Sequence, residues 1–217
     1  MLGKLVKLCG YGCLGCGKGI LNKKKPFCEL CEYYLTKSDT YYNGDILSAI
    51  TYCTREAKSL IYYMKKYDDP YVFDYSAHLI EKKLRKENLI DKLSDYYITY
   101  APRNPISRLT KRFDQSKEIA DFLSIRLFDE DGRVVKLFKR FPFTEEQKTL
   151  GISGRSENAS EIFYLNEKAV LPEKVIIVDD VTTTGATLYA LRDILLDAGV
   201  KECLLCTVAV NDRNYDI

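Results

Sequence analysis

One segment near the C-terminus of this 217-residue sequence restricts the fold more than any other. Residues 175–178 are four consecutive apolar residues that favour β-structure, so they predict a strand. Two carboxylates follow, Asp179 and Asp180, and then a run of small residues leads directly into a helix from Ala186. A strand that turns straight into a helix is typical of a parallel sheet covered by helices.

The pattern of apolar residues elsewhere predicts further alternation of helices and strands. Helical spacing begins at Asp45 and continues to about residue 68. We expect more helices at about 72–86, 115–127 and 186–198, and strands at about 96–101, 134–138, 174–178 and 203–210. This order predicts an α/β fold with a mostly parallel sheet flanked by helices, and such a sheet binds its ligand at the carboxyl ends of the strands.

Composition places the chain among globular proteins. Hydrophobic residues make up 46% and charged residues 29%, which excludes a disordered or collagen-like chain. No stretch approaches the roughly 18 consecutive apolar residues of a membrane span, and the first residues are too often interrupted by Lys to be a secretory signal. We therefore expect a cytoplasmic protein without membrane insertion, in which thiols stay reduced.

Cysteine and charge are concentrated at the N-terminus. Residues 1–40 contain five of the eight cysteines, and seven lysines against three acidic residues. The whole chain has a net charge of only +2, so the remainder is slightly acidic. We therefore expect a small head at residues 1–40 and a body at residues 41–217.

The head contains two CxxC pairs, Cys13 with Cys16 and Cys28 with Cys31, separated by eleven residues. Each pair can direct two sulfur atoms to one point, and Gly17 permits the tight turn that this requires. Four thiolates favour a structural Zn²⁺ site, with iron as the chemical rival. Cys203 and Cys206 are three apart on a predicted strand and point to opposite faces, so they cannot readily bind one ion. We assign them, and Cys53, to packing.

The small residues after the acidic pair have the chemistry of an anion cradle. Hydroxyl groups, the amides of a glycine-containing turn and the start of a helix all suit a phosphate monoester. Carboxylates would repel that phosphate, so Asp179 and Asp180 are expected to bind sugar hydroxyls or a hydrated Mg²⁺. Together they predict a ribose 5-phosphate site made by Asp179, Asp180, Thr182, Thr183, Thr184, Gly185, Ala186 and Thr187. A P-loop is excluded because the GKS or GKT ending is missing.

The same segment matches the phosphoribosyl pyrophosphate (PRPP) motif of type I phosphoribosyltransferases. Residues 102–116 resemble the VPVPLxxxRxxxRGFNQA stretch of the ComF family, residues 144–163 its TxxQxxLxxxxRxxNxxxxF stretch, and residues 60–65 its LIxxLK. With the four-cysteine head, these landmarks occur in the family's order. The chain therefore resembles a ComF family protein, a cytosolic competence protein with a zinc finger followed by a type I phosphoribosyltransferase-like domain. It departs from the family pattern at Tyr100, Arg112 and Asp114.

The resemblance implies that PRPP is bound with Mg²⁺ by Asp179, Asp180 and the threonine-rich loop. The pyrophosphate would then lie toward the basic segment after residue 102, and a polar stretch near residues 144–158 would close over the ligand. The residues implied for these two roles are Lys65, Arg103, Arg108, Lys111, Arg112, Gln147, Arg155 and Asn158.

Three functions remain open from the sequence. The first is a PRPP-binding ComF-type protein of natural competence, which handles incoming single-stranded DNA in the cytosol together with other competence proteins, as the resemblance implies. The second is an active phosphoribosyltransferase, a glycosyltransferase of nucleotide metabolism, with an amide or nucleobase acceptor. The third is a nucleic-acid-binding zinc module with a vestigial PRPP site, in which Lys23, Lys24 and Lys25 contact the phosphate backbone.

Overall fold

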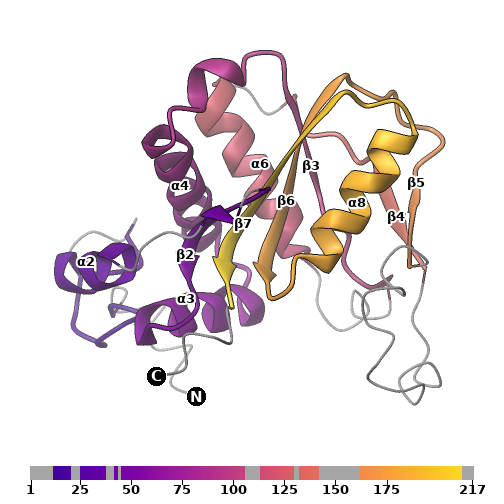
Figure 1. The fold of residues 1–217 in the computed structure, drawn as a ribbon. Helices are drawn as coiled ribbons and strands as arrows, with labels where there is room; N and C mark the ends of the chain where they lie inside the picture. The colour runs from indigo at the N-terminus through magenta and orange to yellow at the C-terminus, as the bar shows by residue number, and fades with distance from the viewer. Residues whose placement is uncertain are drawn as a thin grey trace.

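A computed structural model describes residues 12–20, 25–37, 42–43, 45–105, 113–129, 132–141 and 162–211. Figure 1 shows a central sheet with helices on both faces. The sheet has five strands in the order β1-β2-β7-β6-β3, and only β1 runs antiparallel to its neighbour. Its strands are β1 (Tyr42–Asn43), β2 (Ile46–Thr51), β3 (Tyr97–Tyr100), β6 (Lys174–Thr182) and β7 (Glu202–Val210).

The remaining elements cover this sheet or extend from it. A separate antiparallel pair is formed by β4 (Phe138–Arg140) and β5 (Phe163–Leu165). The helices are α2 (Glu29–Lys37), α3 (Arg55–Lys66), α4 (Pro70–Lys86), the short 3₁₀ helix η1 (Ile90–Lys92), α6 (Gln115–Phe128) and α8 (Ala186–Asp197). Among the described residues, no helix combines the length and apolar character needed to cross a membrane.

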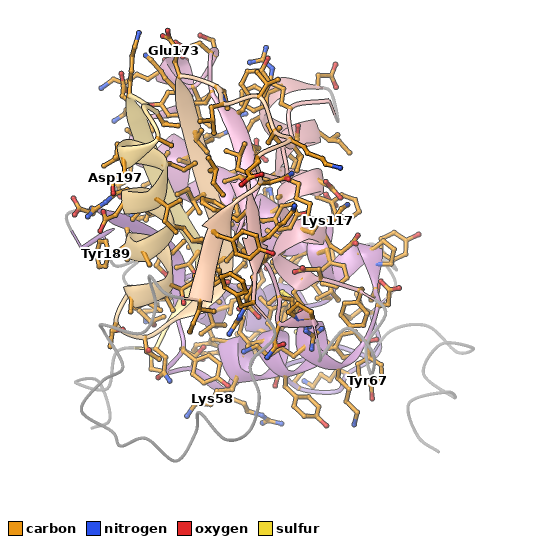
Figure 2. The ribbon with its side chains drawn as sticks, turned by 90° about the vertical axis from the view of Figure 1, so that its right-hand side faces the viewer. Lys58, Tyr67, Lys117, Glu173, Tyr189 and Asp197 are labelled. Atoms are coloured by element: carbon orange, nitrogen blue, oxygen red, sulfur yellow. The ribbon has the colours of Figure 1, made fainter. Side chains whose placement is uncertain are left out.

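Strand β6 lies inside the sheet, paired in parallel with β3 on one side and β7 on the other. Because side chains alternate along a strand, Val175 and Ile177 pack with α8 and the β4–β5 pair, whereas Ile176 and Val178 pack with α4 and α6. Figure 2 turns the molecule so that the β4–β5 pair faces the viewer, with α8 and α6 on opposite sides. Burial on both faces fixes the register of β6, and therefore the position of the carboxylates near its end.

The predicted sheet, mostly parallel and flanked by helices, is confirmed, and most predicted elements lie close to their observed bounds. Two element predictions were wrong. The strand expected at 134–138 is instead β4 at Phe138–Arg140, and Val134 forms only an isolated bridge with Ile98. The helix expected from Asp45 is divided: residues Ile46–Thr51 form β2, and the helix α3 begins only at Arg55. All six residues of β2 are buried and five of them pair with β7, so the ladder and burial outweigh an apolar spacing that also fits a helix.

The cysteines of the body have different environments. Cys203 and Cys206 pack on opposite faces of the sheet, as the spacing predicts. The packing role for Cys53 was wrong, because this residue is exposed in the loop before α3. Its sulfur lies 3.0 Å from the hydroxyl oxygen of Thr51.

The described part of the head packs directly on the body. Cys13, Phe27, Cys31 and Leu35 are buried in the same apolar cluster as α3, α4 and the adjacent face of the sheet. The ring of Phe27 lies 5.7 Å from that of Tyr75 on α4, centroid to centroid. Head and body therefore share one continuous core, and a domain boundary at residue 40 stays a prediction.

Gly185 shows how tightly the loop after β6 is packed. It has a φ of +79°, and a Cβ at this position would lie 2.5 Å from Cδ1 of Ile46 and 2.6 Å from the ring of Tyr189. Gly199 also has a positive φ, of +97°, but a Cβ there would meet nothing within 4 Å. Alanine substitutions at the two positions therefore distinguish the cost of backbone strain, which both share, from the cost of overpacking, which only Gly185 adds.

We predict that Gly185→Ala destabilises the protein more than Gly199→Ala. Both variants incur roughly 1–2 kcal/mol of left-handed backbone strain, and only Gly185→Ala adds an overpacking cost of roughly 1–3 kcal/mol. Urea unfolding followed by circular dichroism measures both losses. Equal losses in the two variants would show that the loop relaxes around the added methyl group.

Candidate functional site

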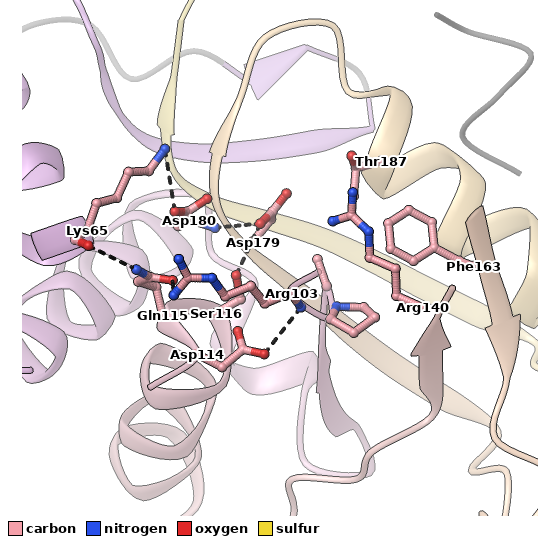
Figure 3. A pocket seen from close by; sticks show the side chains of 12 residues that line it. Lys65, Arg103, Asp114, Gln115, Ser116, Arg140, Phe163, Asp179, Asp180 and Thr187 are labelled. Carbon is pink, nitrogen blue, oxygen red and sulfur yellow. Dashed lines mark hydrogen bonds and ion pairs between the residues drawn. The ribbon is translucent and has the colours of Figure 1, made fainter. Parts of the chain in front are cut away.

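A cavity of about 330 Å³ opens at the carboxyl ends of β3 and β6 (Figure 3). This is the edge at which a parallel sheet places its ligand. The cavity is lined by residues from α3, the loop after β3, the start of α6, the β4–β5 pair, the end of β6 and the start of α8: Lys65, Ala101, Pro102, Arg103, Asp114, Gln115, Ser116, Arg140, Phe163, Asp179, Asp180 and Thr187.

The acidic pair lies side by side on the wall formed by β6. Oδ1 of Asp179 accepts hydrogen bonds from the hydroxyl of Ser116 at 3.1 Å and from the backbone N–H of Asp180 at 2.8 Å. Oδ1 of Asp180 accepts from the backbone N–H of Val181 at 2.7 Å, and its Oδ2 lies 3.7 Å from Nζ of Lys65. Each carboxylate is therefore held by one oxygen to the protein backbone.

Burial raises the pKa of Asp179 to about 8, and the negative charge of Asp180 adds to this effect. The hydrogen bonds from Asp180 N–H and Ser116, and the charge of Lys65, act in the opposite direction without cancelling it. Two carboxylates this close in a low-dielectric site favour a cation or a set of hydroxyl donors beside them. The site thus suits a sugar diol or a hydrated divalent metal.

The threonine-rich loop forms the turn between β6 and α8. The hydroxyl of Thr182 accepts from the N–H of Gly185 at 3.0 Å, and that of Thr184 accepts from the N–H of Ala186 at 3.3 Å. Thr183 and Thr184 are exposed, and Thr187 lines the cavity. The loop therefore places hydroxyl groups and the positive end of a twelve-residue helix beside the acidic pair, as an anion cradle requires.

Arg103 is fixed by the start of α6. Its backbone N–H donates to the carboxylate of Asp114 at 3.2 Å, and its Nη1 donates to the carbonyl of Phe113 at 3.0 Å and to Oε1 of Gln115 at 3.3 Å. The amide of Gln115 in turn donates to the carbonyl of Lys65 at 3.4 Å. The departure from the family pattern at Asp114 thus has a role, because this carboxylate positions the loop that carries Arg103.

Arg140 is one of the cavity residues that the predicted site did not include, together with Ser116 and Gln115. Its guanidinium lies over the ring of Phe163 at 5.2 Å and extends toward Thr187 and Asp179 (Figure 3). Its Nε is buried and has no hydrogen-bond partner among the described residues. Burial lowers the pKa of this guanidinium, and the charge of Asp179 opposes that shift. The only sequence signal was its place just before the polar stretch at residues 144–158.

The predicted site residues are only partly brought together. Of those described, Asp179, Asp180, Thr187, Lys65 and Arg103 line the cavity. The remainder of the threonine-rich loop lies next to it. Several predicted residues fall outside the described part of the chain, namely Arg108, Lys111, Arg112, Gln147, Arg155 and Asn158.

The four cysteines of the head form a second site. The sulfur atoms of Cys13, Cys16, Cys28 and Cys31 all lie within 4.8 Å of one another, and those of Cys16 and Cys28 are 3.8 Å apart. Tetrahedral zinc with Zn–S bonds of about 2.3 Å requires sulfur atoms about 3.8 Å apart, so the donor set fits this metal.

Backbone N–H groups already support negative charge on this cluster. The N–H of Cys28 donates to the sulfur of Cys13 at 3.3 Å. Burial raises the pKa of Cys13, but hydrogen bonds from the backbone of Cys28, Cys16 and Gly15 outweigh it and lower the pKa to about 7. A thiolate is the form that binds metal, so the turn favours metal binding.

The chain is similar to "Competence protein ComFC" of Streptococcus pneumoniae (strain ATCC BAA-255 / R6), with 25% identity over 143 residues. This match covers 64% of the chain and 60% of the relative, so the chain spans about three-fifths of the length of the curated protein it matches. No protein-family model matches the sequence. The four-cysteine cluster and this relative fit a ComF-type protein.

A solved structure was also found. The crystal structure of a purine phosphoribosyltransferase from Pyrococcus horikoshii Ot3 is 19% identical, with a TM-score of 0.35. The match covers 64% of this chain and 73% of that one. The fold of this chain, a mostly parallel sheet flanked by helices, is assigned from its own strand pairing.

We predict that Asp179→Asn stabilises the ligand-free protein. The folded-state pKa lies above the usual 3.8, so the folded state keeps a proton that the unfolded state releases, and stability falls as pH rises from about 4 to about 8. The variant removes this loss, and we expect its Tm to exceed that of the wild type by at least several degrees at pH 8 and by little at pH 4.

Differential scanning fluorimetry across this pH range measures the difference. Asp91→Asn, at an exposed position on η1, changes the net charge equally and is the control. The same pH dependence in wild type and Asp179→Asn would contradict the raised pKa.

Proposed function

We propose that the chain is a ComF-type protein that binds PRPP, or a ribose 5-phosphate ligand, in the cavity at the end of β6. One observation carries this proposal: the cavity joins an acidic pair to the start of α8 and to three cationic side chains, Lys65, Arg103 and Arg140. A sugar diol needs hydrogen-bond acceptors, whereas phosphate groups need N–H and O–H donors and positive charge. The cavity offers both kinds of group within one volume.

The residues present support distinct roles. Asp179 and Asp180 would accept from the ribose hydroxyls, and their oxygen atoms are donors of the type that Mg²⁺ prefers. A bound Mg²⁺ would neutralise part of the pyrophosphate charge. The loop from Thr182 to Thr187 would bind the 5-phosphate, and Lys65 with Arg103 would face the pyrophosphate. The roles predicted for residues in 106–112 and 142–161, in binding the pyrophosphate and in closing over the ligand, are also proposals.

Transfer of the ribosyl group to an acceptor is the second candidate. The two-stranded β4–β5 pair lines the same cavity through Arg140 and Phe163, which leaves protein surface beside the ribose for another substrate. PRPP consumption with a panel of acceptors distinguishes a transferase from a binder.

A role in natural competence and in the handling of single-stranded DNA in the cytoplasm is part of the same proposal. It is supported by the name of the pneumococcal relative. In the head, Tyr33 and Tyr34 are exposed, and Nζ of Lys37 lies 5.4 Å from the ring of Tyr33, a combination that suits base stacking beside a phosphate.

We predict that PRPP with Mg²⁺ raises the Tm of the wild type. A ligand at one hundred times its Kd stabilises a protein by about 2.7 kcal/mol, which is a shift of several degrees at this size. Asp179→Asn combined with Asp180→Asn should abolish the shift, measured against the ligand-free Tm of each variant. Asp91→Asn combined with Asp197→Asn is the control of equal charge. A wild type without any shift would overturn the proposal.

We propose that the four-cysteine cluster binds structural Zn²⁺, and we expect about one zinc ion per chain in elemental analysis. Cys13→Ser combined with Cys28→Ser should lose the metal and lower the Tm, because Cys13 is buried in the core shared by head and body. Cys53→Ser, an exposed cysteine, should keep both. Iron in place of zinc, or full stability without metal, would contradict the assignment.

A further inference from the structure

Arg140 reaches the cavity at the end of β6 from the β4–β5 pair. Because side chains alternate along a strand, Arg140 lies on the same face of β4 as Phe138, which is buried. Phe138 and Phe163 pack in one apolar cluster with Leu188, which lies in the first turn of α8. This packing holds the β4–β5 pair close to the start of α8, and Arg140 and Thr187 therefore line the same cavity.

The guanidinium of Arg140 is held by packing rather than by an acid. It lies over the ring of Phe163 at 5.2 Å, and in the described part of the chain it forms no salt bridge. Its Nε is buried and lacks a hydrogen-bond partner among the described residues. A buried donor without a partner costs free energy unless a ligand accepts from it. The fold therefore keeps a hydrogen-bond donor available in the wall of the cavity.

The charge of Arg140 is also poorly matched by its surroundings. A second, smaller cavity of about 170 Å³ shares Arg103 and Arg140 with the first, and its described lining contains four cations and no carboxylate. In the first cavity the charge of Asp179 acts on Arg140. That carboxylate already accepts hydrogen bonds from Ser116 and from the backbone N–H of Asp180. The described surroundings of Arg140 therefore favour an anionic ligand.

The cations of the first cavity lie at two ends, with the acidic pair between them (Figure 3). Lys65 and Arg103 lie at one end, where Gln115 accepts from Nη1 of Arg103 at 3.3 Å and donates to the carbonyl of Lys65 at 3.4 Å. Arg140 lies at the other end and extends toward Thr187. A ligand that matches this order has hydroxyl groups in the middle and an anionic group at each end.

We propose that Arg140 binds the 5-phosphate of the ribose ligand at the start of α8, and that it selects a ribose that carries this group. The inference rests on the proposed function, because it adds a specificity-determining residue to the same site. Arg140 would donate to the phosphate from the β4–β5 pair, and the threonine-rich loop would donate from α8. A guanidinium presents its donors as a planar fork that suits phosphate oxygens, and its position over Phe163 limits the entropy lost on binding.

Ribose 5-phosphate and inorganic pyrophosphate test this assignment, because they carry the anionic groups expected at the two ends of the cavity. We would titrate each by calorimetry, in the presence of Mg²⁺, into the wild type and Arg140→Met. We expect Arg140→Met to bind ribose 5-phosphate roughly tenfold or more weakly, through the loss of charge-assisted hydrogen bonds. Its affinity for pyrophosphate should stay within about twofold of the wild type.

The Tm of the ligand-free protein distinguishes ligand binding from a structural role. The variant removes a buried donor without a described partner, and a methionine side chain also packs well on an aromatic ring. We therefore expect Arg140→Met to melt at or above the wild-type temperature. Arg85→Met, at an exposed position on α4, removes the same charge and should keep the wild-type affinity for both ligands.

Equal weakening of both ligands in Arg140→Met would overturn the proposal, because Arg140 would then supply only general positive charge. Wild-type affinity of this variant for ribose 5-phosphate would overturn it as well. A ligand-free Tm lowered by several degrees would make Arg140 a structural residue, which is also contrary to the proposal.

If ribose 5-phosphate does not bind the wild type, the proposed function fails, and inorganic phosphate titrated alone decides the role of Arg140. Phosphate binding that is lost in Arg140→Met and kept in Arg85→Met would uphold an anion site at Arg140. Phosphate binding that does not depend on Arg140, or no binding at all, would overturn it.

Discussion

The burial of Asp179 next to a second carboxylate, Asp180, dominates the electrostatics of the site at the end of β6. Strand β6 is buried on both faces and is paired with β3 as far as Val178 and with β7 at Asp179, so the backbone that carries the two carboxylates is held in place. The surroundings compensate with Ser116, backbone N–H groups and Lys65, but these do not remove the rise in the pKa of Asp179. A carboxyl group with so strongly raised a pKa at the wall of a cavity is typical of a ligand-binding site.

The sequence predicted those parts of the fold that depend on local pattern. The strand into Asp179, the helix from Ala186 and the two CxxC pairs each occupy a short continuous segment, where spacing and residue type determine structure. The division of residues 45–66 into β2 and α3 was not predicted, because an apolar run fits either period and only pairing with β7 decides it. The contribution of Arg140 was missed for a similar reason: nothing local distinguishes it from a surface cation. Its place in the cavity comes from the pairing of β4 with β5, which sets Arg140 opposite Phe163.

In the head, too, local sequence pattern indicated the cysteine pairs but not how this part packs on the body. Composition indicated a separate basic, thiolate-rich part, yet Phe27 and Leu35 are buried with residues of α3 and α4 in one cluster. A metal held by the four cysteines would therefore stabilise more than its own turn, since it would fix the side chains that cover α3. Helix α3 ends at Lys66, and Lys65 lies 3.7 Å from Asp180 in the cavity. The metal site and the proposed ligand site are thus connected through one helix of twelve residues.

The two cavities differ in the charge of their described linings, and therefore in the ligands that they favour. The first combines three carboxylates with cations, and so suits a ligand that carries both hydroxyl and phosphate groups. The second, with cations alone in its described lining, suits an anion. Arg103 and Arg140 belong to both linings, so the charge of one cavity affects the ligand preference of the other.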